Sequence, residues 1–71
     1  MKLKANDYAS SHLIKIIREW TEMSQQDFAQ SIGLTRSAIA KYEGDERNFS
    51  FATFMKICRE HNIDVILEKK K

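Results

Sequence analysis

The fold of this chain is decided by residues 25–42, which read QQDFAQSIGLTRSAIAKY. Within this stretch, apolar or small side chains recur at the intervals of two short helices that pack on each other. The positions that carry these side chains are Phe28, Ala29, Ile32, Gly33, Leu34, Ile39 and Tyr42. The pattern therefore predicts a helix, a sharp turn and a second helix.

Specific residues mark the limits of the two helices. Ser24 and Thr35 precede them, and a hydroxyl at such a position accepts a hydrogen bond from a free backbone N–H of the first turn. Gly33 follows the first helix, because glycine enters the left-handed conformation at little cost. The two helices come closest at Ala29, where a bulkier side chain is expected to push them apart.

A further helix is predicted on each side of this unit. The first runs from about residue 8 to residue 21, and Ser10 or Ser11 is its expected cap. The second begins after Ser50 and ends near His61 and Asn62. One apolar face is formed by Leu13, Ile14, Ile17 and Trp20 in the first helix and by Phe51, Phe54, Met55 and Cys58 in the second.

The composition agrees with a single small helical domain. The chain has 71 residues, no proline and two glycines, and 42% of its residues are hydrophobic. We therefore expect residues 1–71 to form one compact all-α domain of four to five helices. The large apolar residues of the expected core are Trp20, Phe28, Ile32, Ile39, Tyr42, Phe51 and Phe54.

The last residues, 63–71, have a different character. Residues 63–68 are rich in β-branched side chains and predict a short strand, with a fifth helical turn as the alternative. A lone strand is unstable in water, so we expect this one to pair across a homodimer or with residues 2–4. The apolar residues available for dimerisation are Ile63, Val65, Ile66 and Leu67.

The spacing within residues 25–42 resembles that of the Cro and phage-repressor family of helix-turn-helix proteins, also called XRE-like. The resemblance extends from about Leu13 to His61 and includes residues 23–26 and the later Arg47, Asn48 and Ser50. It implies a lambda-repressor-like fold. The chain departs from the family pattern in the loop, because members often carry glycine one place after Gly44 and proline at the position of Phe49.

The resemblance also implies that residues 36–41 read double-stranded DNA. In this family the second helix of the motif lies in the major groove, and the first residue of the preceding helix contacts a phosphate. Arg36 and Lys41 are the candidate donors to guanine, and Ala40 is a candidate contact for a thymine methyl group. The full set of expected DNA-binding residues is Gln25, Thr35, Arg36, Ser37, Ala40, Lys41, Arg47 and Asn48.

The first hypothesis is therefore a regulator of transcription that binds an operator as a homodimer. The distribution of charge favours a second hypothesis. The chain has a formal net charge of +2, but residues 5–68 contain seven basic against ten acidic residues. Between residues 35 and 47, Arg36, Lys41 and Arg47 are balanced by three acids. The second hypothesis is therefore a modulator or antitoxin-like protein that binds a partner such as a repressor. Its candidate partner-binding residues are Glu43, Asp45 and Glu46.

Other classes of function have little support in the sequence. No nucleophile, base and orienting group occur together, so we expect no enzymatic activity, no cofactor and no small-molecule substrate. His12, Cys58 and His61 lack the close spacing of zinc ligands. No apolar run is long enough to span a membrane, and the single cysteine and the N-terminal sequence suit a cytoplasmic protein.

Overall fold

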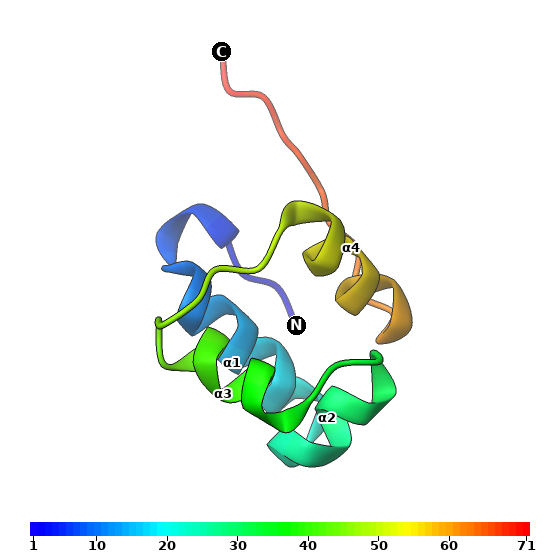
Figure 1. Cartoon of the computed structure of the whole chain (residues 1–71). Helices are drawn as coiled ribbons and strands as arrows, with labels where there is room; N and C mark the ends of the chain where they lie inside the picture. The colour runs from blue at the N-terminus through cyan, green and yellow to red at the C-terminus, as the bar shows by residue number, and fades with distance from the viewer.

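The computed structural model describes residues 1–71 and contains four α-helices and no strand (Figure 1). A short 3-10 helix, η1 (Ala5–Asp7), precedes α1 (Ser10–Thr21). The motif identified in the sequence forms α2 (Gln25–Ser31) and α3 (Arg36–Glu43), and α4 (Phe51–Glu60) follows a loop. The all-α prediction is therefore confirmed. None of these helices is long and apolar enough to cross a membrane.

Three of the four α-helices begin at the residues that the sequence indicates. The side-chain oxygens of Ser24, Thr35 and Ser50 each accept a hydrogen bond, at 3.1 Å, from the backbone N–H three residues later. The expectation for the first helix is wrong, because its N-cap is Ala9, which makes no side-chain cap. Ser10 lies inside the helix instead.

Helix α1 ends on a left-handed residue, Glu22 (φ 60°), and each of the other three α-helices is followed by one residue in that conformation. These residues are Gly33 after α2, Asp45 after α3 and Asn62 after α4, with φ values of 71°, 62° and 56°. After each of these three residues, the backbone N–H of the following residue donates a hydrogen bond to a carbonyl in the last turn of the helix. In α2, for example, the N–H of Leu34 donates to the carbonyl of Ala29 at 2.9 Å. Asp45 therefore takes the conformation that glycine often supplies in the family at this position.

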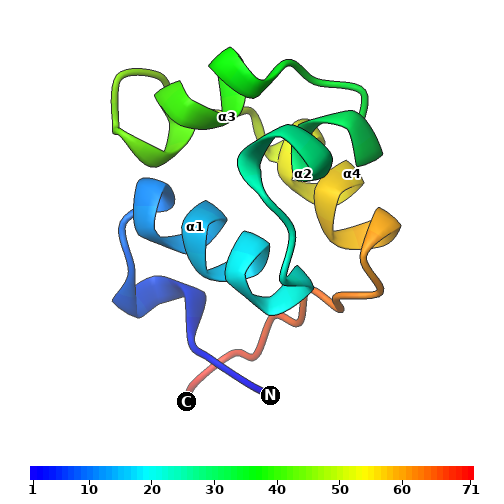
Figure 2. The same cartoon turned by 90° about the horizontal axis from the view of Figure 1, so that it is seen from below.

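The core lies where the helices meet. Helices α1 and α3 lie side by side in both views, and α2 packs closely on α3 (Figures 1 and 2). Ala29 is fully buried, as its position at the approach of α2 and α3 requires. The buried core residues are Ile14, Ile17, Phe28, Ala29, Ile32, Ala38, Ile39, Tyr42, Ile57 and Cys58.

Helix α4 closes the core through its last turns. The ring of His61, at the end of α4, stacks on Phe28 of α2 with ring centroids 5.1 Å apart. Its Nε2 atom lies 3.0 Å from the hydroxyl of Ser31. Because this hydroxyl donates its proton to the carbonyl of Phe28, Nε2 is the donor to Ser31. These contacts tie the end of α4 to the end of α2.

The apolar face of α4 differs from the expected one. Phe51 is 68% exposed, whereas Ile57, which the predicted face leaves out, is fully buried. Phe51 is the first residue of the helix and lies beyond the edge of the core, so no neighbouring helix covers it. Trp20, expected in the core, is half-buried.

The C-terminal residues form neither the strand nor the extra helical turn that the sequence predicts. Ile63 is half-buried, and its N–H donates to the carbonyl of Cys58, but residues 64–71 make no backbone hydrogen bond. Residues 2–4 do not pair with them. The tail leaves the body (Figure 1), with Leu67 91% exposed. A strand needs a partner for its N–H and C=O groups, and one chain supplies none here.

Candidate nucleic-acid interface

Four of the expected DNA-binding side chains share one face of α3. Within this helix Ala38, Ile39 and Tyr42 are turned into the core. The side chains that remain exposed are Arg36, Ser37, Ala40 and Lys41. The structure thus brings the four predicted base-reading residues together on one continuous, uncovered surface.

Thr35, immediately before α3, holds the start of that helix. Its side-chain oxygen accepts the N–H of Ala38 at 3.1 Å. A hydroxyl has one proton to donate as well as its lone pairs, so the cap leaves the Thr35 O–H available to an external acceptor. The residue is exposed, and both roles expected of it are therefore compatible with its geometry.

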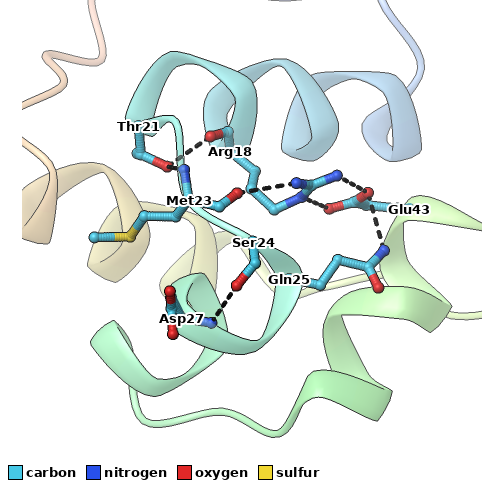
Figure 3. Close-up of polar contacts among 7 residues, drawn as sticks. All are labelled: Arg18, Thr21, Met23, Ser24, Gln25, Asp27 and Glu43. Atoms are coloured by element: carbon cyan, nitrogen blue, oxygen red, sulfur yellow. Dashed lines mark hydrogen bonds and ion pairs between the residues drawn. The ribbon is translucent and has the colours of Figure 1, made fainter.

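Gln25, the first residue of α2, is less free than the sequence suggests. Its side chain is half-buried, and its amide nitrogen Nε2 donates a hydrogen bond to Oε1 of Glu43, the last residue of α3 (Figure 3). The two atoms lie 3.3 Å apart. The residue expected to contact phosphate is thus already engaged inside the protein.

Glu43 is also the partner of Arg18 from α1. The Nε and Nη2 atoms of Arg18 donate to the two carboxylate oxygens at 2.6 and 3.1 Å, and Nη1 donates to the Met23 carbonyl at 3.0 Å. This bidentate pair is mostly buried, since the side chains of Arg18 and Glu43 are 18% and 8% exposed. The hydrogen bond to Glu43 raises the pKa of Arg18, whereas desolvation lowers it and the charges of Glu43 and Glu19 raise it further.

These contacts correct the prediction for Glu43. The sequence suggests a solvated carboxylate available to a partner protein, but the side chain is enclosed and accepts three hydrogen bonds. Arg18 is not among the residues predicted from the sequence. One feature of the sequence does indicate that both side chains lie near the core. Arg18 follows Ile14 by four residues, and Glu43 follows Ile39 by four residues, so each charge lies at the edge of a buried helix face.

The ion pair changes the charge balance of the α3 side. Arg18 and Glu43 cancel each other, so Glu43 no longer offsets the basic residues of this surface. Arg36, Lys41 and Arg47 then face only Asp45 and Glu46, which leaves an excess of one positive charge. The equal number of acids and bases in the sequence predicts no net positive field here. The excess of one positive charge makes this surface more favourable for binding phosphate groups than that count indicates.

The loop after α3 carries the remaining expected residues. Arg47 and Asn48 are both exposed, as backbone-gripping residues need to be. Asn48 also receives a hydrogen bond of 3.4 Å from the hydroxyl of Ser10 through its side-chain oxygen, which connects the loop to the start of α1. The amide nitrogen of Asn48 is left for other acceptors.

The structure brings no three histidine, cysteine or acidic side chains together in a way that would hold a metal ion. Cys58 is buried in the core, and this burial raises the pKa of its thiol. A neutral, enclosed thiol is a poor nucleophile and a poor metal ligand.

Comparisons with known proteins agree with this geometry. The family model described as "Helix-turn-helix" (HTH_3) matches residues 14–66. No curated protein sequence matches the chain.

Several solved structures of the protein HipB have a similar fold. A complex of a HipB variant with an O2 20mer has a TM-score of 0.71 and 23% identity, and the match covers 100% of both chains. The HipA-HipB-O2-O3 complex has a TM-score of 0.67 and 23% identity, covering 100% of this chain and 99% of that one. The HipB-O4 20mer complex gives the same values. At this identity the likeness shows the fold alone.

Proposed function

Because this chain belongs to the helix-turn-helix family, we propose that it is a sequence-specific, DNA-binding regulator of transcription that acts on an operator as a homodimer. One observation carries the proposal: the second helix of the motif presents an uncovered face that contains two cations, a hydroxyl and a small apolar side chain. A face of this composition contains the groups that read base edges in the major groove.

Each residue of that face has a proposed role. Arg36 and Lys41 donate to the O6 and N7 atoms of guanine. Ser37 exchanges hydrogen bonds with a base edge or a phosphate, and Ala40 contacts a thymine methyl group. These four residues carry the sequence preference.

The surrounding residues hold the protein on the phosphate backbone. Thr35 donates its free hydroxyl proton to one phosphate, and Gln25 donates an amide N–H to another. Arg47 supplies charge and Asn48 an amide donor from the loop that follows α3. These contacts fix the position of α3 and add affinity without sequence preference.

The experiment that tests the proposal is a gel-shift titration over a series of salt concentrations. The probes are duplexes selected with the protein from a randomised library. Counterion release makes phosphate-mediated binding fall steeply with salt, by about 10³-fold between 50 and 200 mM for six phosphate contacts. Selection of a common sequence together with a steep salt dependence is the expected result.

Substitutions on α3 test the assignment of the reading face. Arg36→Ala and Lys41→Ala are each expected to weaken binding to the selected duplex by about 1–3 kcal/mol and to relax its sequence preference. Lys15→Ala is the matched control, because Lys15 is an exposed cation on α1 rather than on α3. Unchanged sequence preference in both α3 variants would overturn the assignment.

A second candidate function is modulation of another protein, such as a repressor. The observation that favours it is the pair of exposed acids Asp45 and Glu46 beside the end of α3, neither of which forms an ion pair within the chain. One of the similar structures contains HipB together with HipA, so a protein of this fold is found with another protein. Absence of a gel shift even at low salt, together with capture of a basic partner by wild type but not by Asp45→Asn, would favour this function.

A further inference from the structure

The side chain of Gln25 is held in one orientation by its neighbour on α3. A primary amide has a donor end and an acceptor end, and only the donor end is attracted to a carboxylate. The hydrogen bond from Nε2 of Gln25 to Oε1 of Glu43 therefore fixes which end of the amide lies against α3 (Figure 3). An unrestrained glutamine at the start of a helix would sample many rotamers.

Glu43 is itself held in place. Arg18 contacts both of its carboxylate oxygens, and the same guanidinium donates to the carbonyl of Met23 in the connection between α1 and α2 (Figure 3). Thr21 accepts the N–H of Met23 at 3.3 Å and so steadies this connection. One polar cluster thus joins α1, the first residue of α2 and the last residue of α3.

The cluster leaves a defined donor unused. Nε2 of Gln25 carries two N–H groups, and Glu43 accepts one of them. The carboxylate of Glu43 is almost fully enclosed and its charge is matched by Arg18, so it opposes an approaching phosphate far less than a free carboxylate would. The second N–H of Gln25 belongs to a half-buried side chain with access to solvent.

We propose that Glu43 is a positioning residue for DNA binding: it orients the amide of Gln25 so that the second N–H meets a phosphate oxygen, while Arg18 neutralises the carboxylate. This inference rests on the proposed function, because it assigns a mechanism to one of its phosphate contacts. A preorganised donor loses less conformational freedom on binding than a mobile one. Glu43 therefore affects DNA affinity through Gln25 and without touching DNA.

The first arm of the test needs no DNA. The side-chain NH2 group of Gln25 is observed by ¹⁵N NMR relaxation in the wild type and in Glu43→Gln. The positioning role requires a rigid Gln25 amide in the wild type and increased motion in the variant. Gln26 and Gln30 are internal controls, because both are exposed on the same helix and their amides make no hydrogen bond within the protein. A Gln25 amide as mobile as theirs in the wild type would overturn the proposal.

The second arm is a double-mutant cycle on binding to the selected duplex. Glu43→Gln also removes a negative charge, which favours DNA binding in any background, so the cycle compares its effect with Gln25 present and in the Gln25→Ala background. We expect the two effects to differ by about threefold or more, with the less favourable effect where Gln25 is present. Equal fold-changes in the two backgrounds would show a purely structural or electrostatic role and overturn the proposal.

Controls separate the possible failures. Thermal unfolding identifies a Glu43→Gln variant that no longer folds; Glu43→Asp, which keeps the charge for Arg18 but shortens the side chain, then replaces it in both arms. If the wild type binds no duplex at low salt, the proposed function fails and the phosphate contact fails with it. If the wild type binds the duplex but the effects of Glu43→Gln and Gln25→Ala on affinity are additive, the positioning role of Glu43 is overturned and the proposed function stands.

Discussion

Asp45 combines two unfavourable properties at the end of α3. Its φ of 62° lies in the left-handed region, where a side chain costs about 1–2 kcal/mol in general, and its negative charge lies at the end of a helix that favours cations. We expect Asp45→Gly to raise the free energy of unfolding by about 0.5–1 kcal/mol, measured by urea denaturation. The glycine would relieve both the backbone strain and the charge.

Asp45→Asn separates these two contributions. Asparagine keeps a side chain that tolerates the left-handed conformation but carries no charge, so its gain in stability is expected to be smaller than that of Asp45→Gly. Both variants should bind the selected duplex more tightly at low salt, because each raises the positive charge beside α3. A lower stability of Asp45→Gly than of the wild type would contradict this account of the turn.

Single residues also show how far the site could be predicted. The exposed face of α3 follows from helical periodicity, because Ala38, Ile39 and Tyr42 define the buried side and the rest of the helix must face outward. The environment of Glu43 does not follow, since its partner Arg18 lies 25 residues away in another helix. Periodicity gives the side of a helix on which a charge lies, whereas the pairing of two charges depends on how the helices cross.

Between elements, the approach of α2 to α3 depends on Ala29. This residue is fully buried, and its carbonyl accepts the N–H groups of Ile32 and Leu34 in the turn that joins the helices. We expect Ala29→Leu to lower the free energy of unfolding by about 1–3 kcal/mol, because the larger side chain has no space. Thermal unfolding should show a loss of several degrees in Tm, about 4–8 °C per kcal/mol for a domain of this size.

Ala52 provides the matched control for this substitution. It lies on α4 and is exposed, so Ala52→Leu adds the same atoms without entering the core. Its stability is expected to stay within about 0.5 kcal/mol of the wild type. Equal losses in the two variants would show that Ala29 has no special part in the packing of the motif.

Some features of the helices are determined by local chemistry, such as the residue at which a helix begins. Others, such as which of its residues are buried, are determined by tertiary structure. Ser24, Thr35 and Ser50 cap helices through their own side chains, and a sequence shows such residues directly. The exposure of Phe51 depends on where the core ends, which no local pattern records. Predictions made from caps are therefore confirmed here more often than predictions of which aromatic residue is buried.

At the scale of the whole molecule, the C-terminal tail, residues 64–71, is the part whose backbone groups and apolar side chains lack partners. Val65, Ile66 and Leu67 are exposed, and the backbone from residue 64 onward has no hydrogen-bond partner in the chain. We propose that these residues, with Ile63, pair with the tail of a second copy, which would give two reading helices on one DNA. The composition of residues 63–68 predicts a strand, and the chain by itself forms none, because a strand is stable only when a partner strand is present.

Removal of the tail tests this pairing. We expect the full-length protein to sediment as a dimer at high micromolar concentration and a protein lacking residues 65–71 to sediment as a monomer. The deletion keeps Ile63 and its hydrogen bond to Cys58, so helix content should be retained. Deletion of only Lys69–Lys71, which removes charge and none of the exposed apolar side chains, should leave the dimer intact. A full-length monomer would rule out the paired tails, and the two DNA half-sites would then have to be bound independently.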